Sequence, residues 1–218
     1  MPQKRKDLKI KGANFWYLVG LITSDGCLCK DGRHVDITSK DSAYLLKIKE
    51  NMGLAAGVCV KNRNTNKQAY RIQISNKNFY EFLLSIGLMQ NKSLILGSLK
   101  VPEGFFNDFL RGLIDGDGCI QRWLHPTNGK EQWSVRIFSG SVEFIKWLES
   151  KIERLLRIEG KIHKHSSLWV LKYGKMAARQ IAGQCYYKGC FGLDRKIKLA
   201  QACFDSYQGW SKSKTVLN

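Results

Sequence analysis

The sequence predicts an α+β protein that is built from two copies of one unit. Residues 18–26 read LVGLITSDG and residues 110–118 read LRGLIDGDG, so a stretch of nine residues recurs 92 positions later in a chain of 218. Helical spacing and strand-like alternation follow each stretch in the same order. An apolar content of 44% is enough for a packed core in both copies. We expect subdomains over 13–90 and 104–205, joined by a linker over 91–103.

The repeated stretch predicts a helix that packs closely against its counterpart. Small residues lie four apart in each copy, Gly20 with Ser24 and Gly112 with Gly116, and therefore share one helix face. A face without bulky side chains lets two helix backbones approach each other. Glycine inside a helix otherwise costs about 0.5–1 kcal/mol relative to alanine, which indicates a packing role.

Each copy of the stretch ends in an aspartate and a glycine. Asp25 and Asp117 are expected at helix C-termini, where the macrodipole disfavours an anion, and Gly26 and Gly118 in the left-handed conformation that ends many helices. Helices packed side by side would also bring the two carboxylates together, so that they repel each other. Both effects predict a bound cation, and carboxylate and carbonyl oxygens suit a hard divalent ion such as Mg²⁺. One such acid would mark an ordinary helix end, whereas two matched acids favour a shared site.

Three helices and two hairpins are expected in each copy, in the order αββαββα. In the first copy these are a helix from Asn14, its N-cap, to Asp25, strands over 27–30 and 33–38, a helix that Ser39 or Asp41 caps and that ends at Met52, strands over 58–63 and 70–75, and a helix over 77–86. In the second copy they are a helix over 104–117, strands over 119–124 and 133–138, a helix over 142–156, a hairpin that turns at 165–167, and a helix over 175–186. The two ends of the chain are expected to be a basic, flexible arm over 1–12 and a loose tail over 206–218.

The chain is strongly basic, with 36 Lys and Arg against 18 Asp and Glu and a net charge of +18. Such an excess indicates a polyanionic partner, usually nucleic acid. Apolar runs are too short for a transmembrane helix or a signal peptide, so we expect an intracellular protein of the cytoplasm, nucleoid or an organelle matrix, without a membrane partner. Seven cysteines without CxxC spacing suit a reducing compartment. A zinc site from Cys185, Cys190 and a histidine is the weaker alternative to free thiols.

The predicted strands carry a distinctive set of polar side chains on their outer faces. Successive side chains alternate between the two faces of a strand, and the faces opposite the apolar ones are poor in Glu and rich in residue types that contact phosphates and base edges. Asp36 can accept a hydrogen bond from cytosine, Arg71 and Arg136 can donate to guanine, and Trp123 can equally belong to the core. The expected DNA-contacting residues are Cys29, Asp31, His34, Asp36, Thr38, Lys61, Arg63, Arg71 and Gln73 in the first copy, and Gln121, Trp123, His125, Gln132, Ser134, Arg136, Lys161, His163 and His165 in the second.

The two repeated stretches resemble the namesake motifs of the LAGLIDADG homing endonucleases, in the single-chain form with two motifs. The similarity extends over about residues 13–205, because the order of the flanking elements also fits. It implies αββαββα subdomains with the motif helices at their interface, antiparallel sheets that form a DNA-binding saddle, and a monomer. It also implies that Asp25 and Asp117 bind metal, with the carbonyl groups of Ser24 and Gly116 as further ligands.

The chain departs from the family's motif at two positions. Thr23 stands where the first motif usually has an acid, whereas the second motif keeps that acid as Asp115. Because this acid is usually not the metal ligand, the change affects symmetry more than activity. Arg111 stands where a small residue is usual, and in a helical projection it is expected to point outward.

The resemblance implies a site-specific endonuclease that hydrolyses both strands of a long, loosely palindromic DNA target with Mg²⁺ and leaves 3′ overhangs; Mn²⁺ or Ca²⁺ can replace Mg²⁺ for binding. Lys92 and Lys196 occupy corresponding places in the two copies and are expected to assist catalysis. Lys40 is a further candidate, but Gly140 lies opposite it, so its role would be one-sided. Three other interpretations stay open: an intron RNA maturase whose partner is intron RNA, a DNA-binding regulator that does not cleave, and a basic structural protein.

Overall fold

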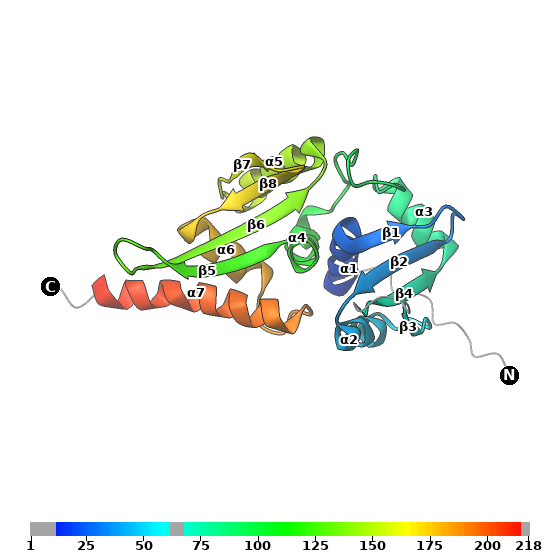
Figure 1. The fold of residues 1–218 in the computed structure, drawn as a ribbon, viewed down its shortest axis with the longest axis horizontal. Coiled ribbons are helices and arrows are strands. Elements are labelled where there is room, and N and C mark those ends of the chain that lie inside the picture. The colour runs from blue at the N-terminus through cyan, green and yellow to red at the C-terminus, as the bar shows by residue number, and fades with distance from the viewer. Residues whose placement is uncertain (1–11, 62–67, 215–218) are drawn as a thin grey trace.

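The computed structural model describes residues 12–61 and 68–214, with side chains through residue 206. It confirms the α+β class and the order αββαββα in both halves (Figure 1). The first half contains α1 (Ala13–Asp25), β1 (Gly26–Leu28), β2 (His34–Ser39), α2 (Ser42–Met52), β3 (Val58–Val60), β4 (Tyr70–Ser75) and α3 (Lys77–Ser85). The second half contains a 3-10 turn (Glu103–Phe105), α4 (Phe106–Asp115), β5 (Cys119–Leu124), β6 (Glu131–Ser139), α5 (Val142–Leu156), β7 (Lys161–His165), β8 (Leu168–Tyr173), α6 (Lys175–Cys185) and α7 (Asp194–Lys214).

Each half holds a four-stranded antiparallel sheet, in the strand order β1-β2-β4-β3 and β5-β6-β8-β7. One face of each sheet is apolar and buried, with Val35 and Ile37 in the first sheet and Val135 and Ile137 in the second. Helices α2 and α3 pack against the first sheet, and α5 and α6 pack against the second. The polar side chains that alternate with these residues therefore lie on the opposite faces, and the two sheets diverge from the middle of the molecule (Figure 1).

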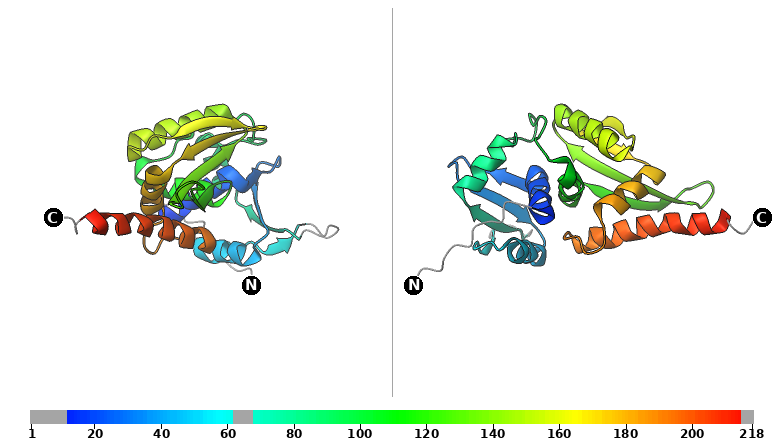
Figure 2. Two further views of the ribbon diagram at one scale, coloured as in Figure 1. Left: turned by 60° about the vertical axis from the view of Figure 1, so that its left-hand side comes forward. Right: turned by 180° about the vertical axis from the view of Figure 1, so that it is seen from behind.

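The two motif helices, α1 and α4, lie side by side at the centre, as the small residues predict (Figures 1 and 2). A Cβ atom added to Gly20 would collide with the carbonyl oxygen of Phe109, and one added to Gly112 would lie 2.7 Å from the amide nitrogen of Leu21. Because the obstacles are backbone atoms, even alanine would push the helices apart. The predicted packing role of these glycines is confirmed.

The glycines at the ends of the motif helices do not have the predicted conformation. Gly26 has φ −85° and ψ 158°, which is extended backbone, and Gly118 also lies outside the left-handed region. They are needed for space instead: a Cβ atom would lie 2.6 Å from the Cα atom of Ile22 at Gly26 and 2.5 Å from that of Ile114 at Gly118. The chain here turns sharply back across the last turn of its own helix.

The helix starts confirm one expected cap and correct another. Asp41 caps α2, because its carboxylate accepts a hydrogen bond from the amide of Tyr44 at 3.0 Å. Asn14 does not cap α1, which begins at Ala13 after Gly12. Its side chain instead donates to Asn51 at 2.6 Å, since the contact with the end of α2 lies on that side of α1.

Arg111 is the clearest correction to the sequence analysis, because it is fully buried (0% exposed) instead of pointing outward. Its guanidinium group donates to the carboxylate of Asp108 at 2.8 Å and to the carbonyl oxygens of Cys185 and Phe191 at 2.8 and 2.9 Å. It also lies 5.2 Å from the ring centroid of Tyr17. The segment between α6 and α7 covers this side of α4, which a projection of one helix does not reveal.

The C-terminal region is a long helix and corrects the expectation of a loose tail after residue 205. Helix α7 begins at Asp194, runs beside the second half and reaches Lys214 (Figures 1 and 2). Ala200 and Cys203 are buried, and α7 packs on α6, where a Cβ atom at Gly183 would lie 2.6 Å from the ring of Phe204. Tertiary packing thus stabilises the part of α7 before residue 206, although its own pattern is weak. Residues 1–11 of the expected basic arm and the turn 64–67 lie outside the described residues.

None of the helices among the described residues combines the length and the hydropathy that crossing a membrane requires.

Candidate active site between the motif helices

Two carboxylates meet where the motif helices end. Asp25 is the last residue of α1, and Asp117 follows the end of α4 by two residues. Their carboxyl groups are close enough that, after burial, the charge of Asp117 raises the pKa of Asp25. The residues before them also abut: a Cβ atom at Gly116 would collide with the Ser24 hydroxyl and lie 3.2 Å from Oδ2 of Asp25. The structure therefore brings together all four residues that the resemblance implies as metal ligands.

The two carboxyl groups are electrostatically strained. Burial, followed by the Asp117 charge, raises the pKa of Asp25 to about 6, and burial raises the pKa of Asp117. The ammonium groups of Lys92 and Lys196 offset part of this effect for both acids. Without a bound cation the pair therefore keeps a proton to an unusually high pH.

The donor set fits a hard divalent cation. Two carboxylates and the neighbouring peptide carbonyls supply oxygen atoms only, which suits Mg²⁺, and this ion usually keeps several waters and needs few protein ligands. Within residues 12–61 and 68–214, no three His, Cys, Asp or Glu side chains form a cluster that could hold a metal ion. A site here would consequently rest on the carboxylate pair, carbonyl groups and water. The same finding gives no support to a zinc site at Cys185 and Cys190.

Lys92 and Lys196 occupy equivalent positions at the ends of the two motif helices. Both are buried, at 8% and 4% exposed, and burial lowers the pKa of each. Lys92 donates to the carbonyl oxygen of Gly26, after α1. Lys196 donates at the end of α4 to the carbonyl oxygens of Ile114, Asp115 (2.8 Å), Gly116 (3.4 Å) and Gly118 (2.9 Å). Each ammonium group thus neutralises a helix C-terminus and lies beside the carboxylate pair.

Asp115, the first acid of the second motif, belongs to a buried network that the sequence analysis missed. Its carboxylate accepts hydrogen bonds from the hydroxyl groups of Tyr17 and Tyr186 and from the amide of Leu193, each at 2.7 Å. Thr23, its counterpart in α1, donates to the carbonyl of Val19 in its own helix at 2.8 Å. The two positions therefore support the helix ends, one through tertiary contacts and one locally.

The predicted DNA-contacting residues of the first sheet bond to one another. Asp36 accepts from Arg71 at 3.3 Å and from Gln73 at 2.9 Å. Lys61 donates to Thr38 at 3.0 Å, His34 pairs with Asp31, and Cys29 is half-buried beside them. These side chains form one ordered polar surface. Arg63 lies outside the described residues.

The outer face of the second sheet differs in charge. Arg136 is in register with Lys172, and Lys172 is in register with Lys161, so three cations cross the sheet in one row. Lys172 was missed, although the pairing of β6 with β8 places it on this face. Gln121, Lys161, His163 and His165 are exposed, and Trp123, His125, Gln132 and Arg136 are half-buried.

Two residues of this face clarify the sequence analysis. Trp123 lies outside the hydrophobic core, so the alternative of a core residue is wrong. Ser134 is fully buried (0% exposed), so it does not reach the surface as predicted. Its short side chain lies opposite Gln121 and between Gln132 and Arg136, and these longer neighbours cover it.

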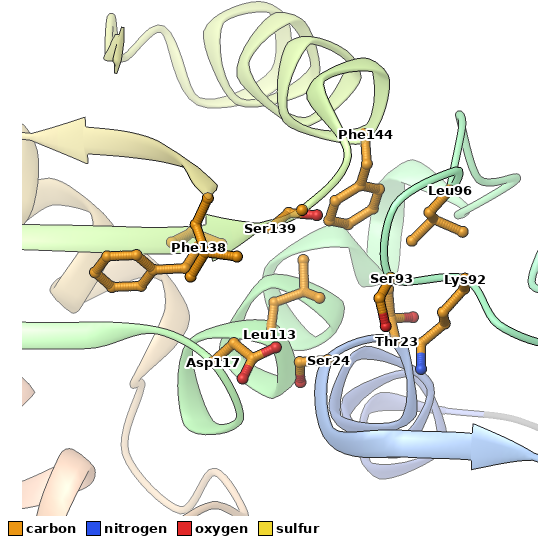
Figure 3. Close-up of a pocket in the computed structure, with 13 residues that line it drawn as sticks. Thr23, Ser24, Lys92, Ser93, Leu96, Leu113, Asp117, Phe138, Ser139 and Phe144 are labelled. Carbon is orange, nitrogen blue, oxygen red and sulfur yellow. The ribbon is translucent and has the colours of Figure 1, made fainter. Parts of the chain in front are cut away.

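Two cavities flank the carboxylate pair. One, which we call the Phe138 cavity, has a volume of about 240 Å³; Asp117 and Ser24 lie at one end and Phe144 and Leu96 at the other (Figure 3). The other, which we call the Lys40 cavity, has a volume of about 620 Å³ and is lined by Asp25, Lys40 and Arg195 among others. Lys40 therefore lies beside the acids on one side only.

Comparison with known proteins rests on structure alone. No protein-family profile matches the sequence, and no curated protein resembles it. The LAGLIDADG meganuclease I-AabMI, solved bound to uncleaved DNA, matches with a TM-score of 0.62 and 15% identity over 95% of this chain and 94% of that one. The homing endonuclease I-WcaI, bound to its DNA recognition sequence, matches with a TM-score of 0.59 and 13% identity over 80% and 81%.

The fold also matches WhiA. The full-length DUF199/WhiA protein from Thermatoga maritima gives a TM-score of 0.57 at 14% identity, and the match covers 89% of this chain but only 60% of WhiA. The N-terminal LAGLIDADG domain of WhiA alone gives a TM-score of 0.52 at 15% identity, with 89% and 90% covered. The resemblance found in the motifs is therefore confirmed as a shared fold, and this chain has the LAGLIDADG homing-endonuclease fold.

Proposed function

We propose that the protein is a metal-dependent endonuclease that cuts both strands of double-stranded DNA at a specific site. The observation that carries this proposal is that the ends of two packed helices bring Asp25 and Asp117, one from each half, beside each other. A protein of purely structural role would gain nothing from two carboxylates that raise each other's free energy.

The chain's own groups have separate tasks in this mechanism. Asp25 and Asp117, with the carbonyl groups of Ser24 and Gly116, would hold Mg²⁺; when bound, the ion supplies charge neutralisation at the phosphate and lowers the pKa of water. Lys92 and Lys196 fix the helix ends that carry the acids and add positive charge where the phosphate gains negative charge. Because each half contributes one acid, the pair can serve both strands, and the resemblance to the LAGLIDADG homing endonucleases implies a staggered double-strand break with 3′ overhangs.

The outer faces of the two sheets would hold the DNA. Their Lys, Arg, Gln and His side chains match phosphates and base edges, and the net charge of +18 favours association with a polyanion. The two faces differ in sequence at most positions, so the target would be long and only loosely palindromic. One chain carries both motifs, which supports a monomer.

A DNA-binding regulator that does not cleave is the second candidate. The match to WhiA favours it, because the fold of this chain is similar to WhiA and not only to the endonucleases. An intron RNA maturase would use the same basic surface with intron RNA as its partner. Neither role needs the contact between Asp25 and Asp117, and that contact makes the endonuclease the stronger proposal.

Incubation with a plasmid library, with and without Mg²⁺, separates the candidates. The proposal expects linear plasmids with one cut position per target in Mg²⁺ and none in EDTA. The Asp25→Asn and Asp117→Asn variants should bind without cutting, and Asp205→Asn, an exposed acid on α7, should cut normally. Specific binding without cutting by the wild type in both Mg²⁺ and Mn²⁺ would overturn the endonuclease in favour of the regulator.

A further inference from the structure

Three apolar side chains interrupt the polar outer face of the second sheet. Phe138 on β6 lies directly opposite Val170 on β8, and Leu168 precedes Val170 by two residues. Because side chains alternate along a strand, all three lie on the outer face that also carries Arg136. Val170 is only 1% exposed and Leu168 is 41% exposed, but neither they nor Phe138 belong to the hydrophobic core of the described residues. We call these three residues the apolar patch.

The pairing of the strands aligns the two sheets position by position. Cys27 and Cys119 each follow the last glycine of a repeated stretch, at the start of β1 and β5. Cys27 is in register with Asp36, and Cys119 is in register with Arg136. Asp36 and Arg136 therefore occupy equivalent positions on the outer faces, and the residues two places later on β2 and β6 are equivalent as well.

The first sheet has polar side chains where the second has the apolar patch. By this alignment Thr38 corresponds to Phe138, and Arg71, the partner of Thr38 on β4, corresponds to Val170. Thr38 accepts a hydrogen bond from Lys61 at 3.0 Å, and Arg71 donates to a carboxylate of the same sheet at 3.3 Å. The apolar patch is therefore a feature of one half only, and the internal repeat does not require it.

The apolar patch lies close to the carboxylate pair. Phe138 and Leu168 line the Phe138 cavity, and Asp117 lines the same cavity (Figure 3). A duplex that presents a phosphate to the acids would therefore cover the patch with the neighbouring base pairs. The patch is thus placed to contact base edges next to the cleavage centre.

The charges around the patch favour DNA as the group that covers it. Arg136, Lys172 and Lys161 form a row of cations on the same face, directly beside the patch. An apolar protein partner would have to bury these cations, whereas DNA neutralises them with its phosphates. The apolar group that base pairs present in the major groove is the C5-methyl group of thymine, and phenylalanine is one of the side chains that contact it.

We propose that Phe138 and Leu168, supported by the buried Val170, recognise the C5-methyl group of a thymine beside the cleavage centre, on the side of the second sheet only. The inference rests on the proposed function in so far as the protein binds double-stranded DNA. Burial of one methyl-sized group contributes about a fourfold gain in affinity. Because uracil lacks this methyl group, the same contact favours DNA over intron RNA.

The test compares thymine with uracil in DNA. A duplex is selected from a randomised library in EDTA, and each thymine near its centre is replaced in turn by deoxyuridine, which pairs with adenine in the same way and lacks only the methyl group. On one side of the centre, one replacement should weaken binding by wild type about three- to fivefold. In Phe138→Asn the same two duplexes should bind about equally. The proposal is wrong if no central thymine shows the loss, or if Phe138→Asn keeps it.

The matched control is Leu124→Asn, which changes an apolar residue that is 64% exposed at the other end of β5. It should keep the wild-type ratio of the two affinities. Each ratio compares two duplexes with one protein preparation, so a smaller folded fraction in a variant does not alter it.

Cleavage in Mg²⁺ of the thymine and uracil duplexes separates this proposal from the endonuclease. Equal binding of the two duplexes together with normal cutting would refute the methyl contact and leave the endonuclease intact. A preference for thymine in binding without any cut would refute the endonuclease and leave the methyl contact intact.

Discussion

The ends of α1 and α4 carry the same acid, glycine and lysine but are held in different ways. At the end of α1, Thr23 bonds to its own helix and Lys92 donates to one carbonyl group. At the end of α4, Asp115 accepts three hydrogen bonds from distant segments and Lys196 donates to four carbonyl groups. The acid, the glycine and the lysine are thus the same in both halves, whereas the hydrogen bonds that hold the two helix ends differ. This pattern is expected when the chemistry needs two matched acids but each half packs against different neighbours.

The largest effect, on DNA cleavage, should come from the two acids that the halves share, Asp25 and Asp117. Asp25→Asn or Asp117→Asn removes one carboxylate from the metal site, and we expect double-strand cleavage to fall by about a thousandfold or more, since metal-ion stabilisation contributes several kcal/mol. Specific DNA binding should persist, because the sheets are unchanged. Plasmid cleavage and gel-shift assays on the same preparations measure both. If either variant lost the cut in one strand and kept the cut in the other strand, the two acids would act separately.

Asp115 and Thr23, which occupy equivalent positions but make different hydrogen bonds, should contribute unequally to the free energy of unfolding. Asp115→Ala leaves the Tyr186 hydroxyl and the Leu193 amide unsatisfied in the interior and leaves the Tyr17 hydroxyl with Tyr44 as its one partner, so we expect a loss of about 2–4 kcal/mol. Thr23→Ala removes one hydrogen bond within a helix and should cost less than about 1 kcal/mol. Urea unfolding of the two variants gives the comparison. Equal losses would mean that the network around Asp115 adds no stability.

A smaller effect should appear in the pH dependence of the metal-free protein. The folded-state pKa of Asp25, about 6, lies above the ordinary value of 3.8. The folded protein therefore holds this proton to a higher pH than the unfolded chain, and its stability falls as the pH rises through the interval between the two values. Asp25→Asn should remove this loss, and after discounting for solvent screening it should raise the melting temperature at neutral pH by about 2–4 °C.

The control for this measurement is Asp205→Asn, which changes the same group on the exposed face of α7. Wild type and Asp205→Asn should lose stability alike between acidic and neutral pH, whereas Asp25→Asn should lose less. If Asp25→Asn followed the other two proteins, the carboxylate pair would not be strained.

The smallest effects should distinguish the two sheets. Lys61→Ala should weaken DNA binding modestly and lower the salt slope by about one, if Lys61 contacts one phosphate. Lys172→Ala should do the same in the second half, where no acid lies in the row with Arg136 and Lys161. Arg71→Ala should alter base preference more than the salt slope, because Asp36 already neutralises this side chain. Titrations at several salt concentrations measure each slope.

Much of the fold follows from local patterns in the sequence. The duplicated stretch predicts the central helix pair, because Gly20 and Gly112 have no local reason to lie inside helices. Strand alternation places Val35 and Ile137 in the core, and the boundaries of β5 and α5 match their predicted ranges. These features depend on residues close together in the chain.

The rest depends on contacts between distant segments. Arg111 is buried by the segment after α6, and α7 packs on α6; neither contact can be derived from a helical projection. Ser134 is covered by longer neighbours in adjacent positions of the sheet. The Lys40 cavity joins residues of the first sheet with Arg195 from the far end of the chain. The sequence predicts the carboxylate pair, whereas the residues that line the cavities on its two sides come from distant segments and cannot be predicted from local patterns.

The most direct test of a cation held by one acid from each half is a titration of Mn²⁺ followed by electron paramagnetic resonance, with the selected DNA duplex present. Wild type should bind Mn²⁺, and both Asp25→Asn and Asp117→Asn should weaken that binding strongly. Binding of Mn²⁺ that is unchanged in both variants would contradict the account, because the ion would then be held elsewhere.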